Sequence, residues 1–140
     1  MYKKVIKYTD FNDVEREEPF YFNMSKAELT RMSFSHGGGF QDFLQNLIDT
    51  RDTTKLYQIF EDLVQMSYGV KSEDGRRFIK NQEVLDAFTQ TDAYSELLVE
   101  LLSSAEAATQ FVTGIMPKDI GEEVAKQRPP VKALEEAKAE

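Results

Sequence analysis

The chain has 140 residues, of which 41% are hydrophobic, and this is enough for one modest domain with a single core. Its formal net charge of −8 argues against a nucleic-acid backbone as partner, since binding phosphates requires clustered Lys and Arg. The absence of Cys excludes disulfides and thiolate zinc ligands.

The distribution of apolar residues along the chain predicts where the folded part lies. No apolar run approaches the roughly 20 residues needed to cross a bilayer, and the N-terminal MYKKVIKYTDF lacks the apolar stretch of a secretory signal. We therefore expect a soluble intracellular protein without a membrane partner. All ten Phe and six Tyr lie between Tyr2 and Phe111. We expect one globular domain over 1–117, followed by a disordered or partly helical tail over 118–140.

The first segment, Tyr2 to Phe22, has the composition of a β-hairpin. β-Branched and aromatic residues flank Asn12-Asp13, a dipeptide that tolerates the positive φ of a tight turn. With a two-residue loop there, the expected cross-strand pairs on one mostly apolar face are Val5 with Phe20, Phe11 with Val14 and Lys7 with Glu18.

Helix signals begin directly after the hairpin. Ser25 with Glu28 is a capping box, which predicts a short helix to about Met32. The segment Ser35-His36-Gly37-Gly38-Gly39 should be a loop, because consecutive glycines make regular structure costly. Apolar residues then follow a helical period in two further stretches, Phe40 to Ile48 and Leu56 to Leu63. The second should run from about Thr54 to Tyr68, with Gly69 as a left-handed cap.

The remaining segments alternate turn and capping residues. Ser72-Glu73-Asp74-Gly75 predicts a turn, and Arg77-Phe78-Ile79 a short extended piece. Three helices should follow, with Asn81 and Thr91 as N-caps and a capping box of Ser103 with Glu106, the last helix stopping at Gly114 and Pro117. The predicted fold is mainly α, with five to six short helices over 24–117, an N-terminal β-hairpin over 1–23 and a flexible C-terminal tail.

The residues offer little for catalysis. A Ser-His dyad would have to use His36, the one histidine, which lies beside the flexible Gly37-Gly38-Gly39. The triple glycine lacks the Lys-Ser or Lys-Thr of a phosphate-binding loop. We therefore predict no enzymatic activity and no cofactor.

Two kinds of charged cluster are candidate ligand sites. The acidic groups are Glu15, Glu17 and Glu18 in the hairpin and Glu122 with Glu123 near the C-terminus, but their spacing does not follow a calcium loop. The basic group is Arg76, Arg77 and Lys80, which sits beside Glu73 and Asp74 and is more typical of a solvated turn. The apolar helix faces have core spacing, and a leftover groove between them would suit a partner helix.

Four segments, in this order, carry a family resemblance: TDFNDVEREEPFYFNMSKAEL, SYGVKSEDGRRFIKN, FTQTDAYSELLVELL and AATQFVTGIMP. Together, over about 1–117, they resemble the tail assembly chaperones of long-tailed (siphovirus or myovirus type) bacteriophages. The resemblance implies a mostly helical protein that acts without cofactors. It implies binding to the tape measure protein and, through a longer frameshifted form diverging within 118–140, to the major tail tube protein.

The resemblance further implies an assembly factor of the host bacterial cytoplasm that is absent from the mature virion. Because one copy would cover only part of a long tape measure, we expect self-association along that partner. No residue with a known contact role maps onto this chain, so the partner-binding residues stay open. Two alternatives remain: a structural tail or head-tail junction protein retained in the virion, and a phage regulator that binds a host protein.

Overall fold

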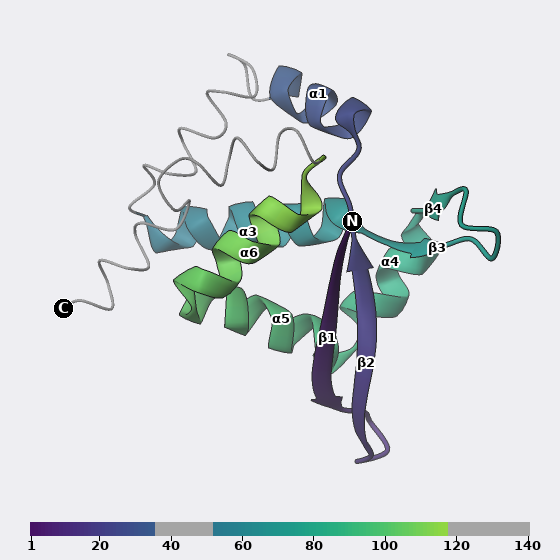
Figure 1. Ribbon diagram of the computed structural model, residues 1–140. Helices are drawn as coiled ribbons and strands as arrows, with labels where there is room; N and C mark the ends of the chain where they lie inside the picture. The colour runs from purple at the N-terminus through teal and green to yellow at the C-terminus, as the bar shows by residue number, and fades with distance from the viewer. Residues whose placement is uncertain (36–51, 118–140) are drawn as a thin grey trace.

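The computed structural model describes residues 1–35 and 52–117, which form a β-sheet packed against helices (Figure 1). The strands are β1 (Tyr2–Thr9), β2 (Glu15–Phe22), β3 (Tyr68–Lys71) and β4 (Phe78–Ile79). The helices are α1 (Lys26–Ser35), α3 (Thr53–Ser67), α4 (Gln82–Thr89), α5 (Asp92–Ser103) and α6 (Ala105–Ile115). Of the predicted loop over 35–39, Ser35 is instead the last residue of α1, and the rest lies outside the described residues, as do the predicted helix over 40–48 and the segment 118–140.

The mainly α prediction with only a hairpin is wrong, because a four-stranded antiparallel sheet in the order β1-β2-β3-β4 runs through the domain. The hairpin β1-β2 supplies its long part. The hairpin β3-β4 extends it through two short ladders, in which Tyr21 pairs with Gly69 and Val70 pairs with Ile79. The predicted turn over 72–75 joins β3 to β4, and Gly75 adopts the left-handed φ of 74°.

The predicted N-terminal hairpin is present, but its register is shifted by one residue. Val5 pairs with Pro19 rather than Phe20, and Lys7 with Glu17 rather than Glu18. The cause is a three-residue loop in place of the expected two-residue loop, since Asp13 takes the left-handed φ of 61° after a turn closed by its amide on the Asp10 carbonyl. Even-numbered residues therefore face the helices.

Two of the four predicted helix caps, Ser25 and Asn81, act as the sequence indicates. In the Ser25–Glu28 capping box, the Glu28 amide donates to Ser25 Oγ at 3.1 Å and the Ser25 amide donates to Glu28 Oε1 at 2.9 Å. Asn81 accepts the Val84 amide at the start of α4. Thr91 precedes α5, yet its hydroxyl donates backward to the Phe88 carbonyl and does not cap the helix.

Two predicted helix boundaries are wrong for local reasons. Gly69 does not end α3 in a left-handed cap but lies in β3, where a Cβ would come within 2.7 Å of the Phe78 ring. The cap of α6 is Ser104, whose Oγ accepts the Ala107 amide, whereas Ser103 ends α5 and donates to the Val99 carbonyl. Gly114 lies inside α6, against the Tyr2 ring.

The core lies between the inner face of the sheet and the helices and is rich in aromatic rings. Phe88 of α4 is central to it. Its ring stacks on Tyr68 at a centroid distance of 4.3 Å and meets Phe22 edge-on at 5.8 Å. Phe111 of α6 packs against Phe22 from the other side. This cluster joins β2, β3, α4 and α6, so the helices fix the position of the hairpin base.

A polar junction beside this core ties four segments together. Lys80 Nζ donates to the Asn23 carbonyl at 2.7 Å and to the Met66 carbonyl at 2.8 Å. It also reaches both carboxylate oxygens of Glu28, at 2.7 and 2.9 Å. Burial alone would raise the pKa of Glu28, but the bonds from Lys80 and the Ser25 amide outweigh it and lower that pKa. The junction ties the first turn of α1 to Lys80 and, through it, to the end of α3.

Candidate binding surface

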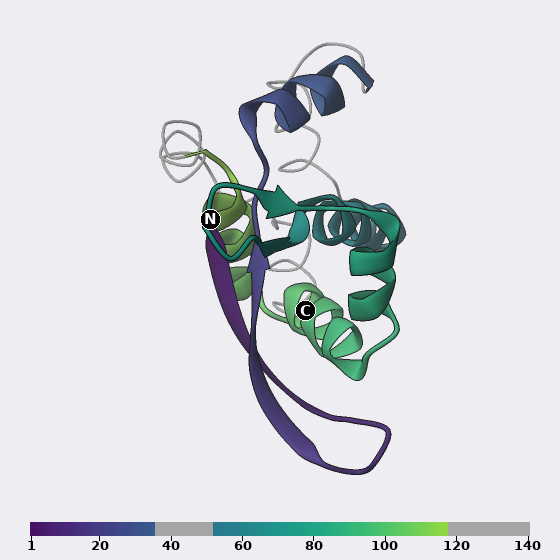
Figure 2. The same ribbon diagram turned by 90° about the vertical axis from the view of Figure 1, so that its right-hand side faces the viewer.

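The hairpin β1-β2 extends beyond the helices, and its tip lies far from the core in both ribbon views (Figures 1 and 2). Only the part of the hairpin nearest the helices is covered, with Ile6 and Phe22 buried. Toward the tip, both faces of the hairpin are open to solvent. A projecting element of this kind is available for contact with another protein.

The tip is held by a compact hydrogen-bond network centred on Asp10. Asp10 Oδ1 accepts the amides of Asn12 at 2.8 Å and Val14 at 3.0 Å, and its Oδ2 accepts Arg16 Nε at 2.5 Å. The bond from Arg16, followed by that from the Val14 amide, lowers the pKa of Asp10 below its ordinary 3.8. These bonds connect both sides of the turn to one side chain.

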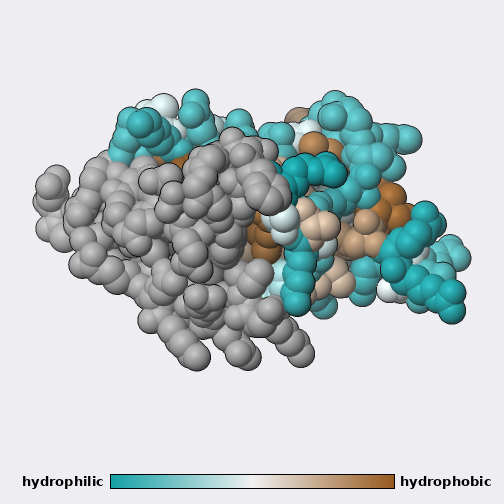
Figure 3. Space-filling view, turned by 90° about the horizontal axis from the view of Figure 1, so that it is seen from above, coloured by the Kyte–Doolittle hydropathy of each residue, from teal (hydrophilic) through white to brown (hydrophobic). Residues whose placement is uncertain are grey.

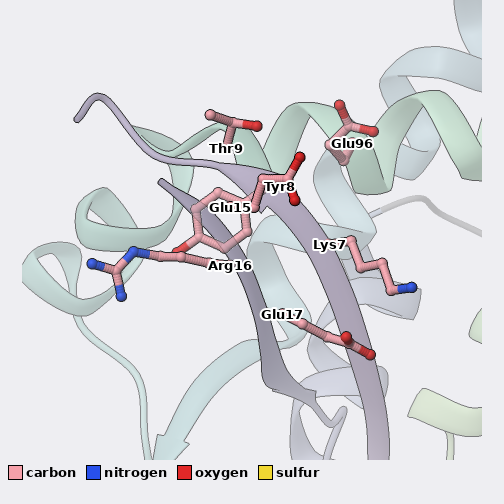
Figure 4. A pocket seen from close by; sticks show the side chains of 7 residues that line it. All are labelled: Lys7, Tyr8, Thr9, Glu15, Arg16, Glu17 and Glu96. Carbon is pink, nitrogen blue, oxygen red and sulfur yellow. The ribbon is translucent and has the colours of Figure 1, made fainter. Parts of the chain in front are cut away.

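Two adjoining hollows lie between the hairpin and helix α5. The larger, of about 500 Å³, is shown in Figure 4; the smaller is about 350 Å³. Both are lined by Lys7 of β1 and Glu96 of α5, so they form one trough along β1. The α5 wall of the smaller hollow is Glu96, Val99, Glu100 and Ser103, which share one helix face because of their i, i+3, i+4 and i+7 spacing.

The charges around this trough are mixed. The larger hollow is lined by the carboxylates of Glu15, Glu17 and Glu96 and by Lys7 and Arg16. Lys4 Nζ bridges to Glu100 Oε1 at 2.7 Å and so ties β1 to α5. On the inner side of the hairpin, a hydrogen bond to Glu18 raises the pKa of Tyr8 above 10.0. The trough is thus suited to contact with polar or charged groups.

The described residues contain no group of three or more His, Asp or Glu placed to hold a metal ion. In the same part of the chain, no helix has the length and apolar character of a membrane span. The described surface offers charged side chains and exposed apolar ones for contact with a partner.

A comparison with family models decides the identity. The model described as phage tail assembly chaperone matches residues 1–140. The chain belongs to this family. No curated protein and no solved structure matches it significantly. The resemblance seen in the sequence is thereby confirmed, and it extends over the whole chain rather than over 1–117 alone. As a phage tail assembly chaperone, the protein binds tail proteins, and its family is generally non-enzymatic.

Among the described residues of the chaperone, neither the basic group nor the acidic group of the hairpin stays together as one site. Arg76 and Arg77 are exposed in the β3-β4 turn, whereas Lys80 is engaged in the Glu28 junction. Glu15 and Glu17 line the trough, but Glu18 lies on the opposite hairpin face against Tyr8. His36, with the glycines at 37–39, and Glu122 and Glu123 lie outside the described residues.

Sequence reasoning missed the exposed apolar residues of the chaperone. Phe11 and Val14 were expected to pair on the apolar face of the hairpin, but the shifted register places them in and beside the loop. The signal that points to this loop is Asp10, a residue type favoured at the first position of a turn. Figure 3 shows hydrophobic side chains between hydrophilic ones on the described surface. The large exposed ones are Met1, Val5, Phe11, Val14, Tyr57, Met66, Val70 and Val99.

Proposed function

We propose that this chaperone binds the tape measure protein, keeps it soluble before the tail tube encloses it, and promotes recruitment and polymerisation of tail tube subunits. The observation that carries the proposal is the match of the tail assembly chaperone family to residues 1–140. Within that family role, the tape measure is the tail protein with most need of a chaperone, because a long helical chain with apolar stripes aggregates when left uncovered.

The surface of the described residues is consistent with such a role. Eight large hydrophobic side chains are exposed among residues 1–35 and 52–117, and the hairpin places two of them far from the core. The net charge of −8 keeps a protein with exposed apolar groups in solution and limits its non-specific association. The same charge favours partners that carry Lys and Arg.

We extend this proposal to the place where the chaperone acts and to its other partners. The chaperone acts in the host bacterial cytoplasm and leaves before the virion is complete. Copies associate with one another along the tape measure, and a longer frameshifted form contacts the major tail tube protein. Residues 1–117 act as the folded domain, and 118–140 is the part of the chain at which the two forms diverge.

Co-expression in bacteria tests the central interaction. The tape measure protein of the same phage is produced alone, with the chaperone, and with an unrelated acidic protein of similar size. The proposal predicts that only the chaperone moves the tape measure from the pellet to the soluble fraction and co-purifies with it. An insoluble tape measure in all three cultures would contradict the proposal.

Mass spectrometry of purified virions and a deletion phage separate this role from the alternatives. A chaperone is absent or scarce in mature particles, whereas a structural tail or head-tail junction protein is present in fixed copy number. A deletion phage that lacks the chaperone should form heads without tails. Normal tails in the deletion phage would instead indicate a regulator that acts on the host.

A further inference from the structure

We propose that the hairpin tip is the element that seats the partner, and that the partner surface is an amphipathic helix whose apolar stripe is flanked by Lys or Arg. We define the tip by its two apolar side chains, Phe11 and Val14, and by three carboxylates, Asp13, Glu15 and Glu17. The inference rests on the proposed binding role, because it names the surface and the partner chemistry of that role.

The apolar part of the tip is the first observation. Phe11 is 79% exposed, more than any other large hydrophobic residue described, and Val14 is 50% exposed. They lie three residues apart at the far end of the hairpin, where no helix covers them (Figures 1 and 2). An aromatic residue in this position adds nothing to the core, and its burial against a partner would remove apolar surface from water.

The second observation is that the tip is preorganised. The Asp10 amide donates to the Val14 carbonyl at 2.9 Å, the Asp13 amide donates to the Asp10 carbonyl at 3.0 Å, and the Asp10 carboxylate holds two more amides and Arg16. A fixed turn loses little conformational freedom on binding, so more of the contact energy appears as affinity. Aromatic anchors held in this way are typical of binding hot spots.

The same bonds decide how the tip can be recognised. Because the amides of Asn12, Asp13 and Val14 already have acceptors within the turn, the tip cannot pair with an added strand. The β1 edge is also guarded by Lys3, Lys4 and Lys7, which are typical of strands that avoid edge pairing. Recognition by the turn itself therefore uses side chains, and a helix offers an apolar stripe wide enough for the two side chains of the tip.

The charge of the tip determines which kind of helix it favours as a partner. Segment 10–18 holds five carboxylates and one Arg. Asp10 is engaged by Arg16, and Glu18 by Tyr8 and Arg16. Within the described residues, Asp13, Glu15 and Glu17 have no ion pair. They favour a partner that carries cations, and they oppose a second copy of this chain, whose net charge is −8.

Peptide binding tests the inference without the tape measure. The full chain is titrated into two labelled monomeric helical peptides with the same Leu stripe, flanked by Lys in one and by Glu in the other. We expect binding of the Lys peptide only. The double variant Phe11→Ser/Val14→Ser should weaken it by about tenfold or more, and Asp13→Asn/Glu15→Gln/Glu17→Gln should weaken it and reduce its dependence on salt.

A matched control is Val70→Ser, because Val70 is 43% exposed but lies on β3, away from the tip. It should bind the Lys peptide as the wild type does. All variants should keep the wild-type melting temperature, since the substituted side chains are exposed. Unchanged affinity in the Phe11/Val14 variant, equal loss in Val70→Ser, or equal binding of the Glu peptide would overturn the inference.

Co-expression with the tape measure then separates the two proposals. If the wild type and the Val70→Ser variant keep the tape measure soluble and the Phe11/Val14 variant does not, both stand. If all three do so equally, the tip inference fails and the proposed function survives. If the wild type does not keep the tape measure soluble, the proposed function fails. The peptide titrations alone then show whether the tip binds a basic amphipathic helix. A smaller oligomer of the Phe11/Val14 variant alone, measured by sedimentation, would assign the tip to a second copy and overturn the inference.

Discussion

Replacing Lys80 by Met should destabilise the fold far more than the same change at Lys4. Both side chains are 23% exposed, so the two substitutions remove equally accessible ammonium groups. Lys80 serves two backbone carbonyls and both oxygens of Glu28, whereas Lys4 has one partner, Glu100, which is 43% exposed. A lost donor to a buried acceptor costs about 1–3 kcal/mol, while an exposed pair contributes roughly 0–1 kcal/mol.

Because Glu28 is 36% exposed and water can reach it, we take the low end of that range, about 1 kcal/mol, for each acceptor group of Lys80, namely the Asn23 carbonyl, the Met66 carbonyl and Glu28. We expect Lys80→Met to lower the free energy of unfolding by about 2–3 kcal/mol. This corresponds to a melting temperature roughly 8–12 °C lower at about 4 °C per kcal/mol. Lys4→Met should lose about 1 kcal/mol or less. Urea unfolding followed by circular dichroism measures both, and equal losses in the two variants would refute the reasoning.

Three further predictions follow from local geometry. Ser104→Ala should cost about 1 kcal/mol by removing the α6 cap, and Ser103→Ala should be nearly neutral, which equilibrium unfolding of the pair can check. Gly69→Ala should lower the free energy of unfolding by about 1–3 kcal/mol. The reason is that the alanine Cβ would lie 2.7 Å from the Phe78 ring and 2.9 Å from the Ile79 carbonyl oxygen. Wild-type stability of this variant would disprove the close contact. Carboxyl NMR should give Asp10 a pKa below 3.8. The Asp10 carboxylate should therefore stabilise the turn above pH 3.8 and lose this effect as the pH falls through the lowered pKa. A titration midpoint of Asp10 at or above 3.8 would contradict the hydrogen bonds that its carboxylate accepts.

The helices could be predicted where their signals are local. Asn81 and the Ser25–Glu28 pair act within one turn of chain, and the structure uses both as the sequence indicates. Ser103 and Ser104 are adjacent and chemically alike, so the sequence could not choose between them. The choice depends on where α5 ends, and packing of its Leu97 and Leu101 in the core sets this.

The four-stranded sheet was missed because its two hairpins are joined by contacts between distant segments, Tyr21 with Gly69 and Phe22 with Tyr68. β3 has four residues and β4 has two, too few for a period to be recognised. A glycine such as Gly69 can serve as a helix cap or lie in a strand where a neighbour approaches closely. Its place in β3 follows from the Phe78 ring, which packs against it. Lys80 likewise looks like a solvated cation beside a turn, because its partners, Asn23, Glu28 and Met66, lie far away in sequence.

The candidate surface was harder to predict than the fold. A two-residue loop would have paired Phe11 with Val14 across the strands, whereas the three-residue loop leaves both side chains exposed at the tip. This one-residue difference depends on Asp13 in the left-handed region and on the Asp10 side chain. The family, by contrast, could be recognised from the order of segments, because that order does not depend on register.

Size-exclusion chromatography with light scattering, applied to the chaperone co-produced with the tape measure protein of its phage, tests the central claim most directly. We expect one peak that holds both proteins, with a mass that requires several chaperone copies for each tape measure. Two separate peaks, or a tape measure that leaves the column in the void volume without the chaperone, would contradict it.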